Sequence, residues 1–376
     1  MTNQPIRVLI ADDSVFMRKL IRDIFESADD FTVAGTVKNG REALDFLQTG
    51  QADIITLDLE MPVMDGITFL QQYYSAAHTG KNTARVLILS SLAEKTAPIT
   101  FKAMELGAVD FIQKPSGSIS LDIKSIADNI LQKARDIHAE RHLTIKSNPA
   151  EHSGQSTTKP CQSTTAHTLS AGPGSEAIFS NKAAISRYEL LLIGASTGGP
   201  QALRNLIPSI DPGFPYPVLI VQHMPEGFTK SFADHLNQIS RIPVHEAEDG
   251  QELKTGEVYI APGNKHFLLR KTGSIYCARL DEGPKVSGHK PSVDAMLCSA
   301  NAINPAKYIA VIMTGMGADG AREITRLAQA GGKTIAQDKD SCVVFGMPRV
   351  AVSLGKIHYV EPLGCIYPRI LDIITG

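Results

Sequence analysis

Apolar residues in the first third of the chain alternate between short continuous runs and longer stretches with helical spacing. The run at 8–11 is typical of a buried strand, and Ser14 precedes apolar positions that recur every three or four residues. This alternation predicts further strands and helices up to about residue 130: strands at 31–37, 53–58, 86–90 and 110–113, and helices at 41–48, from 67, at 99–106 and from about 120. Five β–α units predict a parallel sheet with helices on both faces.

A segment rich in Ser, Thr, Pro and Gly separates the two halves of the chain. Residues 146–180 contain few large apolar side chains, so they cannot bury enough surface to offset the entropy cost of ordering. We therefore expect one domain at 1–130, a helix end and flexible linker at 131–186, and a second domain at 187–376.

The second half has a mixed α/β pattern. Continuous apolar runs at 190–193, 218–221 and 309–313 are typical of central parallel strands. The segments 257–261, 265–270 and 274–279 have the pattern of antiparallel strands, and Gly273 suits a hairpin turn between the last two. We expect a doubly wound, mostly parallel α/β domain with an antiparallel hairpin.

The charge balance, the cysteine spacing and the lengths of the apolar runs each exclude a class of protein. The 37 Lys and Arg residues against 39 Asp and Glu residues give a net charge of −2, which excludes a globally basic nucleic-acid binder. The five cysteines contain no C-x-x-C pair, which argues against a disulfide framework or a zinc site. No apolar run reaches the roughly 18 residues that span a bilayer, and the first residues lack a signal-peptide pattern. We expect a cytoplasmic protein that does not bind nucleic acid.

Polar side chains occupy the ends of the predicted strands in the first domain. Asp12 and Asp13 follow the first strand, Asp58 ends the third, Ser90 ends the fourth and Lys114 follows the fifth. Because the carboxyl ends of parallel strands face one crevice, three carboxylates there favour a hard cation such as Mg²⁺. One carboxylate could then attack phosphorus while the ion and the lysine neutralise the phosphoryl oxygens. Each residue alone could equally be a helix cap or a solvated charge.

As a set, these residues resemble the receiver domain of two-component response regulators. The stretches that carry the resemblance are Ile10-Ala11-Asp12-Asp13-Ser14, residues 58–66, Ser90-Ser91 and residues 111–115. The resemblance implies a flavodoxin-like (βα)5 fold in which Asp58 accepts a phosphoryl group. It also implies a role for the other polar residues: Mg²⁺ held by Asp12, Asp13, Asp58 and the Glu60 carbonyl, a switch hydroxyl on Ser90, and a phosphate ligand in Lys114.

A glycine-rich turn follows the first strand of the second domain. Its sequence, Gly194-Ala195-Ser196-Thr197-Gly198, fits G-x-S-x-G. Such a turn can present Ser196 as a nucleophile for acyl transfer, next to helix N–H groups that bind an anion. Similar turns cradle nucleotide phosphates, so the motif alone leaves both functions open.

Two other strand ends favour catalysis. His223 follows the strand at 218–221, and Asp319 lies in a glycine-rich turn after the strand at 309–313. Ser196, His223 and Asp319 therefore come from strand ends of one parallel sheet, where a catalytic triad can assemble. Asp319 alone could simply cap a helix. The Ser–acid–His order of α/β-hydrolases would require His358, but the pattern around that residue indicates the start of a strand, so we expect His223.

The motifs of the second domain resemble those of the chemotaxis protein-glutamate methylesterases, the CheB family. They span essentially all of residues 187–376, with Lys290 in place of an expected Arg and Phe345 in place of an expected Tyr. The motifs are residues 193–199, 222–225, 259–263, 289–294, 313–320, 334–338 and 344–348.

This resemblance implies hydrolysis of γ-glutamyl methyl esters on chemoreceptors, with release of methanol, and deamidation of receptor glutamines. Ser196 would attack the carbonyl, His223 would move the proton and Asp319 would orient the imidazole. Backbone N–H groups at Thr197 and Met316 would bind the oxyanion. The hydrolysis would need no cofactor, and the protein would contact the membrane only through its receptors. The receiver domain would cover the catalytic face until a chemotaxis histidine kinase phosphorylates it.

Two other classes of function compete with this interpretation. A short-chain NAD(P)-dependent reductase needs Tyr-x-x-x-Lys, and none of the nine tyrosines has a lysine four residues later. A response regulator with a DNA-binding output needs a basic recognition helix after the linker, but Lys and Arg do not cluster there.

Overall fold

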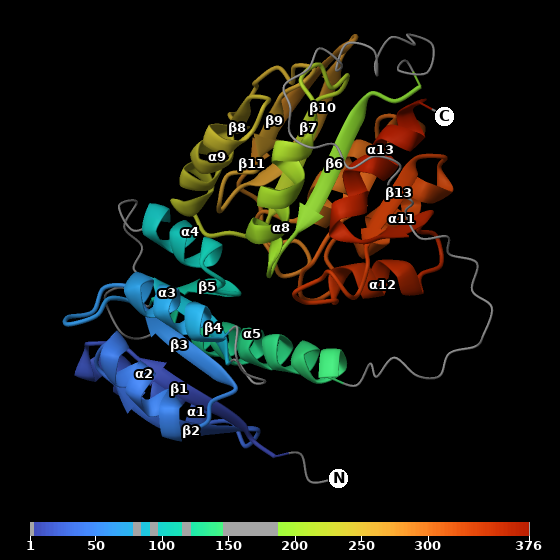
Figure 1. The fold of residues 1–376 in the computed structure, drawn as a ribbon. Helices are drawn as coiled ribbons and strands as arrows, with labels where there is room; N and C mark the ends of the chain where they lie inside the picture. The colour runs from blue at the N-terminus through green and yellow to red at the C-terminus, as the bar shows by residue number, and fades with distance from the viewer. Residues whose placement is uncertain (1–3, 78–83, 91–96, 115–121, 146–186, 376) are drawn as a thin grey trace.

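Two parallel sheets, each covered by helices, make up most of the computed structural model (Figure 1). The structure describes residues 4–77, 84–90, 97–114, 122–145 and 187–375. Most of the linker predicted at 131–186, from residue 146 onward, lies outside the described residues.

The N-terminal sheet has the strand order β2-β1-β3-β4-β5, and every pair of neighbours is parallel. This arrangement confirms the (βα)5 prediction. The strands are β1 (Ile6–Ala11), β2 (Phe31–Val37), β3 (Ile54–Asp58), β4 (Arg85–Ser90) and β5 (Asp110–Gln113). The helices are α1 (Val15–Glu26), α2 (Gly40–Thr49), α3 (Gly66–Ala77), α4 (Ala97–Glu105) and α5 (Asp122–Ile145). Ser14 caps α1 as expected, because its side chain accepts the Met17 N–H at 3.3 Å.

The C-terminal sheet has the order β14-β13-β12-β6-β7-β9-β8, and its neighbours are also parallel. Its strands are β6 (Leu190–Ala195), β7 (Val218–Gln222), β8 (Val244–Glu246), β9 (Val258–Ile260), β12 (Tyr308–Ile312), β13 (Lys333–Gln337) and β14 (Tyr359–Glu361). The helices are α8 (Gly199–Leu206), α9 (Phe228–Ile239), α10 (Val293–Asn301), α11 (Ala321–Gln329), α12 (Met347–Ser353) and α13 (Ile366–Thr375). The adjacent central strands β12, β6 and β7 are buried along their length, as their continuous apolar sequences predict.

One strand direction was predicted wrongly. The segment 257–261 contains β9, which runs parallel to β7 and β8 rather than antiparallel. All three residues of β9 are buried, which is typical of a strand inside a parallel sheet. So short a run carries no periodicity that reveals its direction. The hairpin prediction is confirmed: β10 (His266–Thr272) and β11 (Ile275–Asp281) are antiparallel, and Gly273 has φ +60° in the turn.

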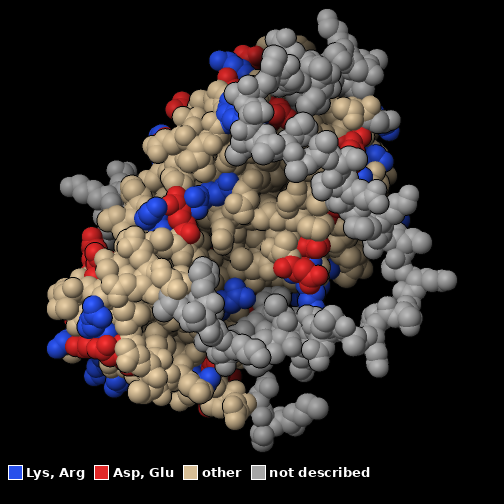
Figure 2. Space-filling model, in the orientation of Figure 1, with Lys and Arg blue, Asp and Glu red and all other residues tan. Residues whose placement is uncertain are grey.

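One face of the molecule carries both signs of charge. On the face shown in Figure 2, Lys and Arg lie among Asp and Glu over both halves. No helix among the described residues is both long enough and apolar enough to cross a membrane.

Candidate functional site

Three side chains from neighbouring strand ends form a hydrogen-bonded chain. Ser196 follows β6, His223 follows β7, and Asp319 lies in the turn between β12 and α11. The Ser196 Oγ atom lies 3.1 Å from His223 Nδ1, and His223 Nε2 lies 2.7 Å from Asp319 Oδ2. The structure thus brings together the three residues that the sequence analysis selected.

The tight turn after β6 holds Ser196 at the sheet edge. Gly198, the residue just before α8, has φ +77°, a left-handed conformation that favours glycine. A Cβ atom on Gly199 would lie only 1.9 Å from Gln222 Oε1. The Gln222 amide donates to the carbonyl of Ser196 at 2.9 Å and to that of His223 at 3.1 Å. Gln222 thereby joins the serine turn to the histidine strand end, a contact that the sequence analysis did not identify.

Asp319 is buried at the N-terminus of α10. It is 2 % exposed, and besides His223 its carboxylate accepts hydrogen bonds from Ser292 Oγ at 2.8 Å and from the N–H groups of Val293 at 2.7 Å and Asp294 at 2.9 Å. Burial by itself would raise the pKa of Asp319, but the hydrogen bond and charge of His223 and these donors hold it below its ordinary value. Asp319 is therefore ionised at neutral pH.

The ionised carboxylate fixes the tautomer of His223. Because an ionised Asp319 can only accept hydrogen bonds, Nε2 of His223 carries the ring proton and donates a hydrogen bond to Asp319. Nδ1 is then an unprotonated acceptor that faces the Ser196 hydroxyl. An imidazole in this state can take the serine proton as the oxygen attacks a carbonyl carbon.

Two backbone N–H groups beside Ser196 are free to bind an oxyanion. Thr197 and Met316 line the cavity that contains Ser196, and neither N–H donates a hydrogen bond to any residue that the structure describes. The turn that carries Met316 packs against the serine, since a Cβ atom on Gly315 would lie 2.8 Å from Ser196 Cβ. Both are therefore candidates for the donors that the oxyanion of a tetrahedral intermediate on Ser196 would require.

His358 lies elsewhere in the fold. It precedes β14 at the edge of the sheet, and its Nδ1 atom lies 2.8 Å from Thr334 Oγ1. It does not line the cavity that contains Ser196. The interpretation of this segment as the start of a strand is confirmed.

The motif at 289–294 supplies parts of the site that the sequence analysis named without assigning a role. Ser292 caps α10, because its side chain accepts the Ala295 N–H, and the same hydroxyl donates to Asp319. His289 stacks on the ring of His223. The helix cap was detectable from the sequence, since Ser292 precedes an apolar helical pattern. The stacking was not, because it depends on a turn that brings distant segments together.

The site opens into a cavity of about 420 Å³ with walls from both halves of the chain. Ser196, His223 and Met316 line it from the C-terminal half, and residues of β5 and α5, including Phe111 and Lys133, line it from the N-terminal half. The N-terminal half therefore stands over the edge of the C-terminal sheet that carries Ser196 and His223.

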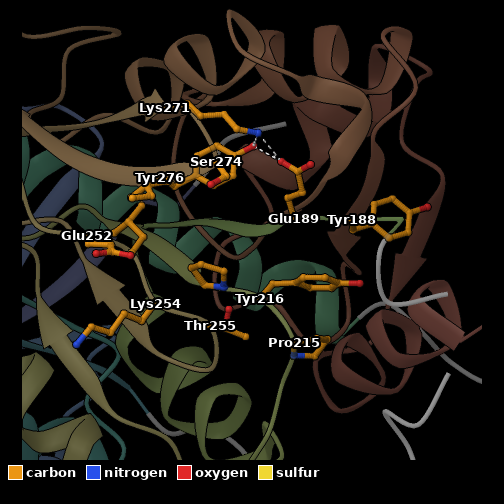
Figure 3. A pocket seen from close by; sticks show the side chains of 13 residues that line it. Tyr188, Glu189, Pro215, Tyr216, Glu252, Lys254, Thr255, Lys271, Ser274 and Tyr276 are labelled. Atoms are coloured by element: carbon orange, nitrogen blue, oxygen red, sulfur yellow. Dashed lines mark hydrogen bonds and ion pairs between the residues drawn. The ribbon is translucent and has the colours of Figure 1, made fainter. Parts of the chain in front are cut away.

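A second cavity, of about 640 Å³, lies at the opposite edge of that sheet. Figure 3 shows Tyr188 and Glu189 just before β6, together with Lys271 and Tyr276 of the hairpin. Here the polar groups satisfy one another, since Glu189 accepts hydrogen bonds from Lys271 at 2.9 Å and from the Tyr276 hydroxyl. None of Ser196, His223 and Asp319 lines this cavity.

Asp12, Asp13 and Asp58 gather at the carboxyl edge of the N-terminal sheet. One oxygen from each lies within 4.8 Å of the others. Lys114 Nζ lies 2.8 Å from Asp12 Oδ2 and 2.7 Å from Asp58 Oδ2. An all-oxygen donor set of this size fits a Mg²⁺ ion, and the Glu60 carbonyl follows Asp58 by two residues.

Electrostatics at this edge favour added positive charge. Burial raises the pKa of Asp58 and Asp12 adds to the rise, although Lys114 opposes it. Burial would lower the pKa of Lys114, but its bonds to Asp12 and Asp58 raise it overall. Lys114 is therefore a permanent cation beside Asp58, and a divalent ion would relieve the remaining repulsion between the carboxylates.

Ser90 connects this edge to α4. Its Oγ atom lies 3.0 Å from Thr100 Oγ1, and both side chains are buried. The next residue on α4 is Phe101, whose ring centroid lies 5.3 Å from that of Phe232 on α9. The contact between Ser90 and Thr100 therefore leads directly to the junction of the two halves.

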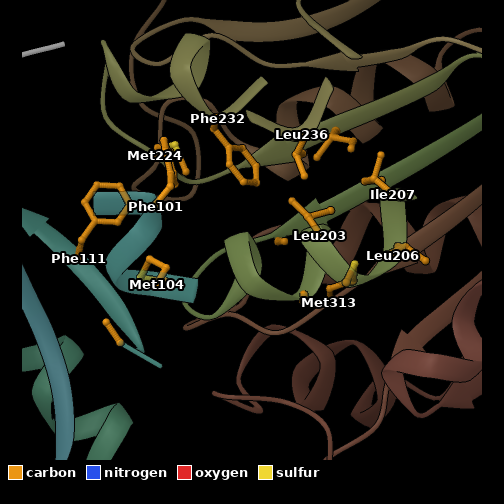
Figure 4. Close-up of a cluster of buried hydrophobic side chains, with 14 of the residues drawn as sticks. Phe101, Met104, Phe111, Leu203, Leu206, Ile207, Met224, Phe232, Leu236 and Met313 are labelled. Atoms are coloured by element: carbon orange, nitrogen blue, oxygen red, sulfur yellow. The ribbon is translucent and has the colours of Figure 1, made fainter. Parts of the chain in front are cut away.

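Aromatic side chains fill that junction. Figure 4 shows Phe101 and Phe111 of the N-terminal half facing Phe232 and Met224 of the C-terminal half. The centroids of Phe111 and Phe228 are 4.8 Å apart, and all of these side chains are buried. The junction between the two halves is therefore an apolar contact from which water is excluded.

An ion pair lies beside the aromatic cluster. Glu105 of α4 accepts from Arg204 of α8 at 2.9 Å and lies 3.2 Å from His235 of α9. Lys102 also pairs with Glu105, at 2.8 Å. The mixed-sign group above α4 in Figure 2 lies at this junction.

Comparison with known proteins agrees with both halves of the architecture. A family model described as CheB methylesterase matches residues 191–370, and one described as response regulator receiver domain matches residues 8–124. A Thermotoga maritima relative, named protein-glutamate methylesterase/protein-glutamine glutaminase, is 40% identical over 374 residues, covering 100% of both chains. This chain belongs to the CheB methylesterase family. It is a hydrolase that carries a response regulator receiver domain.

Other relatives match over a similar length. A Geobacillus kaustophilus protein of the same name is 40% identical over 370 residues, covering 98% of this chain and 99% of its own. Among solved structures, the catalytic domain of Thermotoga maritima CheB methylesterase is 44% identical, with a TM-score of 0.49, and the match covers 50% of this chain and 98% of that one. The response regulator domain of Thermotoga maritima CheB is also 44% identical, with a TM-score of 0.30, and covers 35% of this chain and 95% of that one.

The two competing functions fit the CheB chain poorly. The first turn of α8 offers few donors to a phosphate, because Gly199 N–H bonds to the Ser196 carbonyl and Pro200 has no N–H. A DNA-binding output of the helix-turn-helix kind requires a helical domain, whereas residues 187–375 form a seven-stranded sheet with helices around it.

Proposed function

We propose that this protein hydrolyses γ-glutamyl methyl esters on the cytoplasmic helices of chemoreceptors and deamidates receptor glutamines. The observation that carries the proposal is the continuous chain of hydrogen bonds from Ser196 through His223 to the buried Asp319. The relatives' names supply the substrate class, since they are protein-glutamate methylesterases and glutaminases.

In the first step of the proposed mechanism, Ser196 Oγ attacks the γ-carbonyl carbon while its proton passes to Nδ1 of His223. The carbonyl oxygen becomes an oxyanion and accepts hydrogen bonds from the N–H groups of Thr197 and Met316. Asp319 stabilises the imidazolium through Nε2. No residue other than Ser196 and His223 forms or breaks a covalent bond in this step.

The tetrahedral intermediate then collapses. His223 returns its proton to the leaving group, so a methyl ester releases methanol and a glutamine amide releases ammonia, and an acyl-enzyme remains on Ser196. Water, deprotonated by His223, attacks the acyl-enzyme and yields glutamate with the Ser196 hydroxyl restored. Because both substrates yield the same acyl-enzyme, one site serves both reactions without a cofactor.

We further propose that Asp58 is phosphorylated by a chemotaxis histidine kinase. Mg²⁺ bound by Asp12, Asp13, Asp58 and the Glu60 carbonyl would neutralise the phosphoryl oxygens. Lys114, already paired with Asp58, would bind the phosphoryl group, and Ser90 would turn toward it. A Ser90 hydroxyl that moves toward the phosphate changes its contact with Thr100 on α4, and through α4 the junction beside Phe101.

In the unphosphorylated chain, the receiver domain would block the active site. The cavity walls from β5 and α5 and the buried aromatic junction support this proposal. Phosphorylation would weaken the junction and admit the receptor helix.

The direct test of the proposed function is release of methanol from receptor membranes methylated on their glutamates. The wild-type chain, activated with acetyl phosphate and Mg²⁺, should release methanol, and membranes whose receptors carry glutamine at the same positions should release ammonia. The S196A chain supplies the blank. Absence of methanol above this blank would refute the proposed substrate, and a shift of random DNA by the chain would favour the DNA-binding alternative.

We expect reversal of one charge in the Arg204–Glu105 ion pair to raise the activity of the unphosphorylated chain. In Arg204→Glu, a glutamate would face Glu105, and the loss of a partly buried pair should raise the unphosphorylated rate about tenfold, which corresponds to about 1.4 kcal/mol. The rate in acetyl phosphate should remain that of the wild type. The measurement is initial methanol release by each full-length chain.

Two further variants make this prediction specific. Combining Arg204→Glu with Glu105→Arg restores opposite charges and should lower the basal rate again. Arg326→Glu reverses a charge on the exposed face of α11, away from the junction, and should have no effect. An unchanged basal rate in Arg204→Glu would show that the ion pair does not hold the domains together.

A further inference from the structure

A second histidine lies flat against the proposed general base. The ring centroids of His289 and His223 are 3.8 Å apart, and the rings are inclined by only 11°. This is van der Waals contact over a whole ring face. His223 is thus held at three places: Ser196 and Asp319 at its two nitrogens, and His289 on one face.

A tight hairpin turn fixes the position of His289. The N–H and carbonyl of His289 bond to the carbonyl and N–H of Val286, at 2.9 Å and 3.1 Å. The two residues between them, Ser287 and Gly288, both have positive φ, at 52° and 83°. This combination defines a type I′ turn, which sets the backbone direction at His289 closely.

The ring of His289 is neutral at the pH of catalysis. Burial lowers its pKa to about 4, with further lowering from His223, Lys285 and Lys133, and only Asp319 acts in the opposite direction. Among the described residues, these four groups act on it from the β7 end, its own loop, α5 and the β12–α11 turn. No hydrogen bond to its ring nitrogens occurs within the described residues, so the ring offers its face rather than a proton.

We propose that His289 is a positioning residue for His223: a neutral flat surface that holds the imidazole in the plane joining Ser196 to Asp319 and favours the imidazolium that forms when Ser196 attacks. The proposal rests on the proposed roles of Ser196 and His223. An imidazolium stacked on a neutral π face gains a cation–π interaction, whereas a free ring would rotate about its Cβ–Cγ bond and lose one of its two hydrogen bonds.

The test uses the full-length chain in acetyl phosphate and Mg²⁺, and a fluorophosphonate probe that forms a covalent P–O bond to an activated serine and expels fluoride. The rate of Ser196 labelling, measured from pH 5 to 9 by mass spectrometry of the labelled peptide, reports on the Ser196–His223 pair directly. It does so whatever the natural substrate is.

In the His289→Ala chain, Ser196 should be labelled about tenfold more slowly. The acid limb of the pH–rate profile, where the labelling rate falls as the pH is lowered, should move to lower pH by roughly half a unit to one unit, because the imidazolium loses a stabilising contact. His289→Phe retains a neutral flat face, so it should keep most of the labelling rate, and the acid limb of its pH–rate profile should match that of the wild type. Val286→Ala, at the other end of the same turn and partly exposed, is the matched control and should match the wild type.

If His289 had a merely structural role, its replacement would lower the labelled fraction equally at every pH and leave the acid limb of the pH–rate profile in place. The proposal is overturned if the His289→Ala chain is labelled at the wild-type rate or if its acid limb does not move. It is also overturned if His289→Phe is labelled as slowly as His289→Ala, because that result would assign the role to a ring nitrogen of His289. Methanol release measured on the same samples tests the proposed substrate separately from the proposed role of His289. Labelling of the wild type without methanol release would refute the proposed substrate and leave the comparison of labelling rates valid.

Discussion

Replacing Ser196 with alanine should lower methyl ester hydrolysis by a factor of about 10³ to 10⁶, because the attacking oxygen is lost. The remaining rate would come from the oxyanion donors and from substrate binding, which do not depend on the serine hydroxyl. The measurement is initial methanol release from methylated receptor membranes at saturating acetyl phosphate, with the folded state checked by circular dichroism.

The companion variants distinguish a concerted unit from independent contributions. His223→Ala should lose about as much activity as Ser196→Ala, and the double variant should lose little more than either, because each change disables the same proton-coupled attack. Asp319→Asn should be milder, since the Ser196–His223 contact remains while the carboxylate that sets the tautomer is gone. Additive losses in the double variant would mean that Ser196 and His223 act in separate steps.

His358 provides the control for this series. Its ring bonds to Thr334 at the sheet edge and not to the serine, so His358→Ala should retain activity if the chain folds. Near-normal hydrolysis by Ser196→Ala would show that another group is the nucleophile. Loss of activity in a folded His358→Ala chain would return the α/β-hydrolase order to consideration.

Replacing Asp58 with asparagine should abolish labelling by a radioactive acetyl phosphate. The amide keeps the size of the side chain but lacks the nucleophilic oxygen, and it also weakens the carboxylate set that would hold Mg²⁺. Removal of Mg²⁺ with a chelator should also abolish labelling of the wild type, because the charge on the phosphoryl oxygens would no longer be neutralised. The measurement is the radioactivity retained on the chain after rapid gel filtration.

Three variants complete the phosphorylation experiment. Asp45→Asn makes the same change on the exposed face of α2 and should be labelled normally. Lys114→Ala should still be labelled but should respond poorly in methanol release, because the lysine binds the phosphoryl group without accepting it covalently. Wild-type labelling of Asp58→Asn would move the acceptor to another carboxylate, with Asp13→Asn the next variant to measure.

The sequence was informative where candidate site residues lie at the end of a strand. Ser196, His223 and Asp319 follow continuous apolar runs, and the carboxyl ends of neighbouring parallel strands must lie at one edge of a sheet. The acidic cluster of the receiver domain was accessible by the same reasoning. In both places, periodicity placed the strands and the residue types indicated the chemistry.

The sequence was less informative where contacts depend on packing between distant segments. The direction of β9 could not be derived from three apolar residues, because parallel and antiparallel strands of that length have the same composition. The stacking of His289 on His223 requires the turn at Ser287 and Gly288 to project the ring back over the sheet. The aromatic junction around Phe101 consists of residues that, taken singly, have the pattern of ordinary core.

The proposed block of the active site follows from joining two domains in one chain. A tethered receiver domain has a high effective concentration at the catalytic edge, so even a weak contact can occupy it. Each tenfold activation requires phosphorylation to disfavour the closed arrangement by about 1.4 kcal/mol. Loss of the Arg204–Glu105 pair or of one buried contact such as that of Phe111 with Phe228 is sufficient for a change of this size.

The most direct test compares initial methanol release by the fragment 187–376 with that of the unphosphorylated full-length chain, on the same methylated receptor membranes and at matched concentrations of enzyme. Labelling of Ser196 by the fluorophosphonate probe verifies that the fragment is folded and active. The fragment should be faster than the unphosphorylated full-length chain and indifferent to acetyl phosphate, whereas the full-length chain should accelerate when acetyl phosphate is added. Equal rates with and without the receiver domain would contradict the proposal that this domain covers the Ser196 site, and would leave it as a docking or activating module.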